Sequence, residues 1–243
     1  MMTMNDRMLP RRRWCAVLAL GLMAQACATT SPLVRQECYN PDVQLAGLVQ
    51  PLEALRAKDC AAPDAQRGGL ECTRLRREIR RLAVVCGQHV PTLMATAVIA
   101  YDEQRRTESQ QILDGILALP RSYPEAAVLR SEIAIEEGNV PFAQRLLQER
   151  IKLAPDHSGL REAYAGALYL DGHMEEATTQ LGMAGALGAP RWRVAYHLGL
   201  IAEASGRGSE AARYYAESLD THPGWAPATS RLKALRAGDA TRP

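Results

Sequence analysis

Three glycines recur at a spacing of 34 residues, and this spacing constrains the fold more than any other feature of the sequence. Gly138, Gly172 and Gly206 each precede an alanine by five residues. A fixed period of this length is typical of stacked supersecondary units, none of which can bury its own apolar face alone. We therefore expect a curved stack of helix pairs over this part of the chain.

Other positions of the 34-residue unit carry the residue types that crossing helices need. If each glycine is position 15, positions 8 and 20 hold only small residues, which let two helix backbones approach. They are Ala97, Ser131, Ala165 and Gly199 at position 8, and Ser109, Ala143, Ala177 and Ala211 at position 20. Position 24 holds a large residue for the core in each unit: Leu113, Leu147, Leu181 and Tyr215. Glycine at position 15 favours a left-handed helix end.

These residues resemble the tetratricopeptide repeat (TPR) family specifically. The repeats are 90–123, 124–157, 158–191 and 192–225, within a repeat region 89–225. The first is degenerate, with Gln104 where glycine is expected, and position 27 of the second holds Arg150 where a small residue is usual. The resemblance implies an all-α fold, a right-handed superhelix of stacked helix hairpins. It also implies that the concave face binds a protein or peptide.

The N-terminal residues 1–26 resemble a bacterial lipoprotein signal peptide. Several arginines precede the apolar run 14–24, WCAVLALGLMA, which is too short to span a bilayer as a helix. Residues 24–27, AQAC, then resemble a lipobox, in which Cys27 carries acyl chains such as palmitate and begins the mature chain. The alternative is ordinary signal peptidase, which Ala24-Gln25-Ala26 would also suit. Lipidation is favoured because it leaves four cysteines, an even number, for disulfides.

The resemblance also implies a location. Ala28, and not an aspartate, follows Cys27. In Gram-negative lipoproteins this points to the outer membrane, with the protein lipid-anchored and facing the periplasm. Residues 27–40 are then a short tether, so the folded body stays close to the membrane.

Residues 41–88 are expected to form a disulfide-linked helical hairpin. Asn40-Pro41 opens one helix, and a second runs from about Leu70 to Cys86 after a loop. Cys72 and Cys86 would lie about 21 Å apart along the second helix, too far for a disulfide, which needs Cα atoms within about 7 Å. An antiparallel hairpin then joins Cys60 to Cys72 and Cys38 to Cys86. The alternative is a metal site of all four cysteines, although the paired short spacings of such sites are absent.

The charge of the chain argues against a nucleic-acid partner. The whole chain is +2, and without the four arginines and one aspartate of residues 1–26 it is close to −1. One local basic feature is present, on the second helix of the hairpin. It is either a solvated face or a contact with anionic lipid headgroups or an acidic partner. Its members are Arg74, Arg76, Arg77, Arg80 and Arg81.

Signatures of chemistry are not found in the sequence. The five histidines form no HExxH motif and no close cluster with aspartates, and there is no G-x-S-x-G elbow or glycine-rich phosphate loop. Paired glutamates such as Glu136-Glu137 point about 100° apart on a helix. We therefore expect no enzymatic activity, no cofactor, no metal and no small-molecule substrate.

The concave face is the predicted binding site. In the TPR family, positions 2, 5, 9 and 12 of a repeat point toward it. The candidate partner-binding residues are Tyr101, Val128, Glu132, Ile135, Glu162, Tyr169, Tyr196, Leu200 and Glu203. This set is apolar and acidic, so it favours an apolar or basic peptide or an amphipathic helix. Residues 226–243 are expected to form a capping helix and tail, with Trp225 packed under the cap.

The sequence thus indicates an anchored scaffold that docks a partner in the cell envelope. Lipoproteins of similar build include the pilotins of type IV pili, and others serve barrel assembly or recruit cell-wall enzymes. The alternatives are a periplasmic cell-wall hydrolase system, of which the chain is a part or accessory subunit, and a structural link between membrane and murein. Fewer than 65 residues separate Cys27 from the repeats, which leaves little room for a catalytic domain.

The lipidation hypothesis predicts the behaviour of a Cys27→Ser variant in cells. Without the thiol no acyl chain can be attached, so the variant should either accumulate as a soluble periplasmic form or remain unprocessed. Membrane fractionation with mass spectrometry of the mature N-terminus measures this. A variant that stays in the membrane fraction, together with a wild-type chain that does not begin at residue 27, would show the hypothesis to be wrong.

Overall fold

The described part of the chain folds into helices without strands. The computed structural model describes residues 38–56, 60 and 66–240. Its eleven helices are α2 (Pro41–Arg56), α3 (Gln66–Val85), α4 (Val90–Asp102), α5 (Arg106–Leu117), α6 (Pro124–Glu136), α7 (Val140–Leu153), α8 (Ser158–Leu170), α9 (Met174–Ala186), α10 (Arg191–Ala204), α11 (Gly208–Thr221) and α12 (Ala226–Ala240). The predicted signal peptide 1–26, Cys27 and the tether up to residue 37 lie outside the described residues. None of the described helices is long and apolar enough to cross a membrane.

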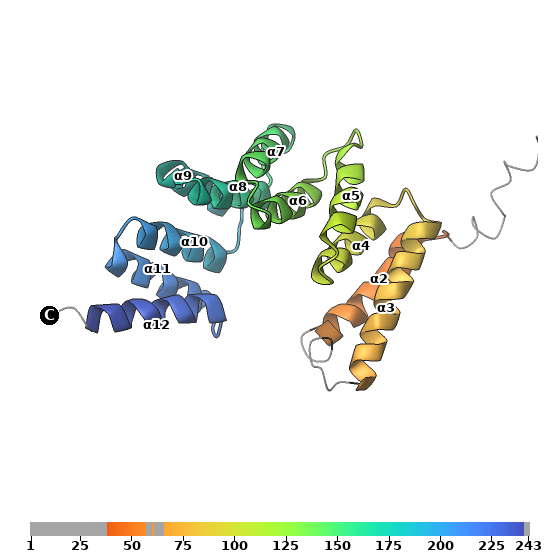
Figure 1. Cartoon of the computed structure of the whole chain (residues 1–243), viewed down its shortest axis with the longest axis horizontal. Coiled ribbons are helices and arrows are strands. Elements are labelled where there is room, and N and C mark those ends of the chain that lie inside the picture. Colours follow the sequence, from red (N-terminus) through yellow and green to blue (C-terminus); the bar gives the residue numbers. More distant parts are fainter. Residues whose placement is uncertain (1–37, 57–59, 61–65, 241–243) are drawn as a thin grey trace, which may run out of the picture.

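Helices α4 to α11 form four antiparallel hairpins that stack in an arc (Figure 1). One helix pair falls in each predicted repeat: α4 and α5, α6 and α7, α8 and α9, α10 and α11. Prolines occupy the first turn of α4, α6 and α7, where a missing backbone N–H leaves no hydrogen bond unmade. The predicted fold class, an all-α solenoid of stacked hairpins with a disulfide-linked N-terminal hairpin, is confirmed.

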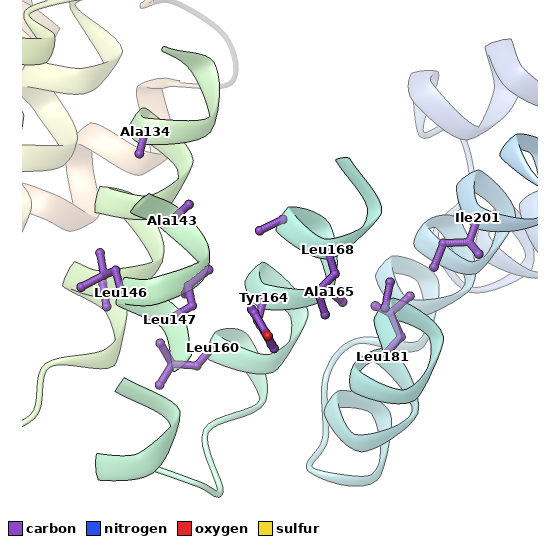
Figure 2. Close-up of a cluster of buried hydrophobic side chains, with 13 residues drawn as sticks. Ala134, Ala143, Leu146, Leu147, Leu160, Tyr164, Ala165, Leu168, Leu181 and Ile201 are labelled. Atoms are coloured by element: carbon purple, nitrogen blue, oxygen red, sulfur yellow. The ribbon is translucent and has the colours of Figure 1, made fainter. Parts of the chain in front are cut away.

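The small residues at the helix crossings are all buried, as their role requires. Each of the eight residues at positions 8 and 20 is buried, and the position-24 side chains lie between the helices with no exposed surface. Figure 2 shows the largest core cluster, which draws side chains from five consecutive helices, α6 to α10. The hairpins of α6 to α10 therefore share one core cluster, and further clusters lie at the two ends of the stack.

In the fourth hairpin, α10 and α11 cross at a different pair of residues from the other three hairpins. Tyr215 stands at position 24 in place of leucine, and Gly199 stands opposite it at position 8. A Cβ atom on Gly199 would lie 2.5 Å from the Tyr215 ring. The absence of that Cβ is therefore what makes room for the tyrosine, whose hydroxyl donates to Glu203 at 2.6 Å.

The turns within the hairpins share one backbone conformation. Gly138, Gly172 and Gly206 have φ of +77°, +83° and +74°. Gln104, in the degenerate first repeat, has φ of +60°. The turn geometry is thus retained without glycine, at the steric cost that a side chain meets in the left-handed region.

Arg150, the unusual residue at position 27, links two neighbouring hairpins. Its Nη2 donates to the carbonyl oxygen of Leu117 at 3.2 Å. Leu117 is the last residue of α5, where backbone carbonyls lack helical partners and carry partial negative charge. The guanidinium therefore satisfies a helix end that a small residue would leave open.

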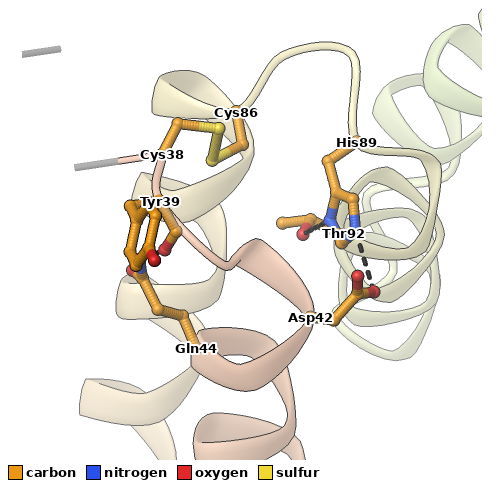
Figure 3. Close-up of a disulfide and its surroundings, with 7 residues drawn as sticks. All are labelled: Cys38, Tyr39, Asp42, Gln44, Cys86, His89 and Thr92. Atoms are coloured by element: carbon orange, nitrogen blue, oxygen red, sulfur yellow. Dashed lines mark hydrogen bonds and ion pairs between the residues drawn. A yellow bond between two sulfur atoms is a disulfide. The ribbon is translucent and has the colours of Figure 1, made fainter. Parts of the chain in front are cut away.

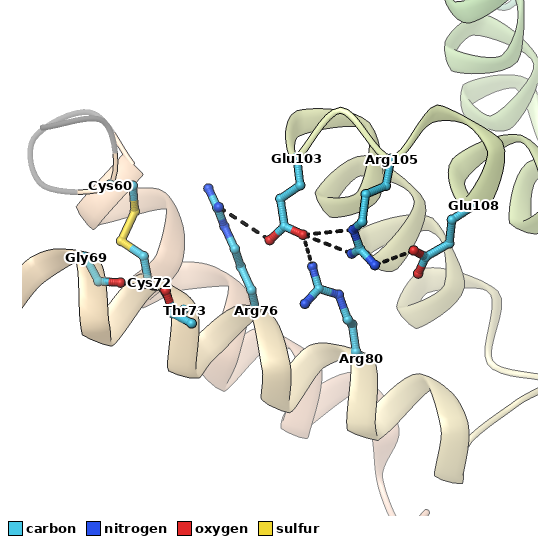
Figure 4. A network of polar contacts seen from close by, with 9 residues as sticks. All are labelled: Cys60, Gly69, Cys72, Thr73, Arg76, Arg80, Glu103, Arg105 and Glu108. Atoms are coloured by element: carbon cyan, nitrogen blue, oxygen red, sulfur yellow. Dashed lines mark hydrogen bonds and ion pairs between the residues drawn. A yellow bond between two sulfur atoms is a disulfide. The ribbon is translucent and has the colours of Figure 1, made fainter. Parts of the chain in front are cut away.

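The N-terminal hairpin consists of α2 and α3, and both predicted cysteine pairs are joined in it. Cys38 is bonded to Cys86 beside the start of α2 (Figure 3), and Cys60 to Cys72 at the far end (Figure 4). Their Cα atoms are 5.3 and 5.8 Å apart. Helix α3 begins at Gln66, four residues before the expected start at Leu70.

The N-terminal hairpin packs on the first repeat through an apolar cluster of α2, α3 and α4 side chains, with polar contacts beside it. The His89 Nε2 atom lies 3.0 Å from an Asp42 oxygen, and its Nδ1 lies 2.6 Å from the Thr92 hydroxyl (Figure 3). At the other side of α3, Arg76 and Arg80 reach the carboxylate of Glu103, which follows α4 (Figure 4). The hairpin therefore continues the stack as an additional helix pair.

Helix α12 covers the other end of the stack. Its Leu232 packs with Tyr215 and Ala211, and Arg231 pairs with Glu203 at 3.1 Å. Trp225 contacts the rings of Trp192 and Tyr196, with centroids 4.6 and 4.4 Å apart. Trp225 thus packs half-buried against α10 of the last repeat, just before the cap begins.

The strained turn predicts that Gln104→Gly will stabilise the protein. Glycine removes the cost of a side chain in the left-handed region, partly offset by the entropy of a more flexible unfolded chain, so we expect a gain of about 0.5–1 kcal/mol in unfolding free energy. Urea denaturation measures it. Gly172→Ala, the reverse change, should lose about 1 kcal/mol. An unchanged or lower stability for Gln104→Gly would contradict this account of the turn.

The pair Gly199 and Tyr215 predicts non-additive stability changes. Gly199→Ala should cost about 1–3 kcal/mol because its methyl group meets the tyrosine ring. The double variant Gly199→Ala with Tyr215→Leu reproduces the Ala165–Leu181 pair of the third repeat, so it should be more stable than the sum of the single changes predicts.

The matched control for this pair is Gly182→Ala in α9. A Cβ atom at Gly182 would meet nothing within 4 Å. The control should therefore gain about 0.5–1 kcal/mol from helix propensity alone. Denaturation of all four variants tests the set, and additivity within error would refute the proposed steric coupling.

Candidate functional site

A groove on the inner side of the stack is bordered by the first helices of three repeats, α6, α8 and α10. Its volume is about 350 Å³. Four of the predicted partner-binding residues line it: Val128, Glu132, Ile135 and Glu162. The remaining lining residues are Ser131, Gly159, Ala163, Gly166, Arg193 and His197. Two glycines and an alanine on α8 keep the floor of the groove free of bulky side chains.

Glu162 is the buried charge of the groove and is held by two residues of α10. Its side chain is 8% exposed. Arg193 Nε donates to Glu162 Oε1 at 2.8 Å, with a second contact to the other oxygen, and His197 Nε2 lies 3.4 Å from Oε1. Burial alone would raise the pKa of Glu162, but the hydrogen bonds from His197 and Arg193 and the charge of Arg193 together lower it. This carboxylate is therefore ionised and already paired.

Glu132 lies on α6, across the groove from Glu162 on α8, and its carboxylate has different neighbours. Its side chain is exposed, and within the described part of the chain its carboxylate has no hydrogen bond or ion pair. Although the side chain is exposed, the protein atoms crowded around the carboxylate raise the pKa of Glu132, and the negative charges of Glu136 and Glu162 add to this, while Arg193 opposes it. The folded protein thus makes the ionised form of Glu132 less favourable and offers it no partner.

The prediction of an acidic groove is therefore correct only in part. Arg193 and His197 were absent from the predicted set, although Arg193 occupies position 2 of its repeat, one of the positions expected to face the groove. Because Arg193 neutralises Glu162, the negative charge that a partner meets comes chiefly from Glu132.

The other five predicted residues lie outside this groove. Tyr101 donates to Glu136, which also pairs with Arg106, and Tyr169 packs half-buried against the core. Tyr196, Leu200 and Glu203 pack against α11 and α12. The capping helix packs on α11, and these three side chains lie half-buried beside that contact, where they stabilise the end of the stack. Their spacing predicted the correct helix face but gave no information on what packs against it.

Groups that could perform catalysis or hold a metal are not gathered in the part of the chain that the structure describes. No set of three or more His, Cys, Asp or Glu side chains among those residues could bind a metal ion. The groove residues include no nucleophile with an adjacent general base. What the arrangement offers is a shallow apolar floor with one unpaired carboxylate, which suits the binding of a side chain.

Comparison with known proteins identifies the fold. Neither a protein-family model nor a curated protein sequence matches the chain. Among solved structures it is similar to a thermophilic TPR protein of Thermus thermophilus, with a TM-score of 0.63 and 17% identity over 78% of this chain and 99% of that one.

Two further solved structures support the same fold. The chain is similar to one in the APC/C hetero-tetramer Cut9–Hcn1, with a TM-score of 0.64 and 14% identity over 86% of this chain and 45% of that one. It is also similar to MamA of Desulfovibrio magneticus, with a TM-score of 0.50 and 13% identity over 72% and 97% of the two chains. The geometry and these similarities together show a tetratricopeptide-repeat fold.

Proposed function

We propose that this protein is a non-catalytic scaffold that holds a segment of another protein in the groove between α6, α8 and α10. The observation that carries the proposal is Glu132. Glu132 lines the groove with its side chain exposed and without a hydrogen bond or ion pair in the described part of the chain, and its surroundings disfavour the ionised form at a small cost in stability. Perturbed groups of this kind are found at functional sites more often than elsewhere. A basic side chain of a partner would compensate that cost.

The partner is accordingly a peptide segment with apolar side chains and at least one lysine or arginine. The apolar part fits the floor between Val128, Ile135 and Ala163, and the cation meets Glu132. Burial of one aliphatic side chain contributes about 1.5–3 kcal/mol, and the cation adds orientation. A helical or extended segment can lie across three parallel helices in this way.

The location proposed for this scaffold follows from residues 1–27. A lipidated Cys27 would anchor the protein at the periplasmic face of the outer membrane. Attached acyl chains contribute about 0.8 kcal/mol per buried methylene, so more than one chain gives a firm anchor. Two disulfides among the described residues support an oxidising compartment, in which such bonds persist. Envelope assemblies near the outer membrane are then the source of the partner.

The proposal predicts a specific effect of Glu132→Gln on peptide binding. Peptides that carry lysine, and matched peptides with acetyl-lysine, are measured by fluorescence anisotropy. The variant should bind the lysine peptides about tenfold or more weakly and lose the preference for lysine, because a hydrogen bond to a charged group contributes about 1.5–3 kcal/mol. Glu149→Gln, at an exposed site on α7, is the matched control and should change nothing.

The same variant separates binding from folding through its pH dependence. Because the folded-state pKa of Glu132 is raised, its ionisation lowers stability at neutral pH. Glu132→Gln should therefore be at least as stable as the wild type there, and this gain should vanish below the ordinary glutamate pKa, where the carboxyl is protonated in both states. Binding of lysine peptides by the wild type should weaken as pH falls through the raised pKa. Persistent lysine preference in Glu132→Gln would refute the proposed site.

A further inference from the structure

The outward face of α3 carries a stripe of apolar and basic side chains. Residues at i, i+4, i+7, i+11 and i+14 fall on one side of an α-helix. In α3 they are Leu70, Arg74, Arg77, Arg81 and Val84. Leu70 is 72% exposed and Val84 is 84% exposed, and the three arginines between them are exposed as well. We refer to these five residues as the α3 stripe.

The arginines of α3 divide into two groups with different tasks. Arg76 and Arg80 turn toward the first repeat and hold Glu103, as Figure 4 shows. They belong to the packing of the hairpin on the stack. Those of the α3 stripe are exposed, and the contacts of Arg74 with Glu71 and of Arg81 with Glu78 are short-range pairs along the same helix. Such surface pairs contribute little to stability.

The stripe continues across a hollow onto α2. This hollow measures about 480 Å³ and is bordered by Val43, Leu48, Arg81 and Val85 among others. Val43 is 71% exposed, and Tyr39, four residues before it, is 72% exposed. Tyrosine is enriched where proteins meet the headgroup level of a bilayer. The α3 stripe, Tyr39 and Val43 together form the hairpin face.

Charge distinguishes the hairpin from the rest of the protein. Residues 41–88 hold eight Lys and Arg against six Asp and Glu, whereas residues 89–243 hold 16 against 19. Among the described residues, the four most exposed large apolar side chains lie at the basic end, whereas the acidic remainder carries the groove and large apolar side chains that are less exposed. An anionic surface would attract the hairpin face and repel the repeats.

The course of the chain places the hairpin face near the proposed membrane anchor. The described structure begins at Cys38, next to Tyr39 (Figure 3). Cys38 comes eleven residues after Cys27, a stretch that spans at most about 40 Å when fully extended. A lipid on Cys27 would therefore keep this face, and not the distant α12, within reach of the bilayer.

We infer that the hairpin face binds the surface of an anionic lipid bilayer. The apolar side chains insert at the headgroup level, and the three arginines of the stripe meet lipid phosphates. This combination of apolar and basic residues on one exposed face is what interfacial binding uses. The inference takes the position of the anchor from the proposed function, but the contact itself needs no lipid on Cys27.

Vesicle sedimentation tests the contact without the acyl chains. The protein is residues 27–243 with Cys27→Ser, which contains every described residue. It is mixed with phosphatidylethanolamine vesicles that contain phosphatidylglycerol, and with matched vesicles that contain phosphatidylcholine instead. We expect binding to the anionic vesicles only, weakened by salt. Arg77→Gln should reduce it about fivefold, and Arg77→Gln with Arg81→Gln about 20-fold. Val84→Ser should reduce it by a similar factor.

Matched controls lie on the repeats. Arg213→Gln removes an exposed charge from α11, and Leu153→Ser an exposed apolar side chain from the end of α7. Both should bind vesicles like the parent protein. Equal loss in the controls, or no preference for anionic vesicles, would overturn the inference. A second contradicting outcome is a photocrosslinker at residue 77 that captures an acidic protein in cells, while the purified protein does not bind vesicles. If the lipidation hypothesis for Cys27 is wrong, the wild-type chain from cells will carry no lipid, and this result is independent of vesicle binding.

Discussion

Close approach of helix backbones at eight small residues is the constraint on which the rest of the structure depends. Where two helices cross at Ala143 or Ala177, no side chain separates them, so the large residue at position 24 of the same repeat can fill the core beside the crossing. Repetition of this crossing at a 34-residue interval turns each hairpin by a similar amount against the last. The curvature that results creates an inner surface, and the groove between α6, α8 and α10 lies on it.

The local features of this fold could be predicted from the sequence because they depend on residues close together in the chain. Small residues at fixed spacing identified the crossings, and the length of a helical segment sufficed to pair four cysteines. What could not be predicted depends on contacts between distant elements. The spacing assigned Glu203 to the concave side, but its partner Arg231 lies on α12, which follows it in the chain and whose docking leaves no periodic signal. Likewise the repeat positions could place Arg193 on the groove side, but they could not show that its guanidinium would bond to Glu162, 31 residues earlier.

Two glutamates on the same surface therefore have opposite roles. Glu162 is buried, its pKa is lowered, and it bonds to Arg193 of α10. It therefore helps to hold the third and fourth repeats together. Glu132 has a raised pKa and no such bond, so its charge is directed to the groove. A prediction based on composition treats the two as equal. Only the geometry separates a carboxylate that stabilises the stack from one that is available to a ligand.

The Cys38–Cys86 bond also determines how the fold responds to mechanical load. Without the bond, a force that pulls on the chain before Cys38 would act on the first turn of α2. It would separate that helix from its neighbours one contact at a time. With the bond, the same tension is shared with the end of α3, whose Arg76 and Arg80 are held by Glu103. The load must then shear two helices from the first repeat together, which breaks many contacts at once. A protein pulled between a membrane and a bound partner would hold its shape longer under such a connection.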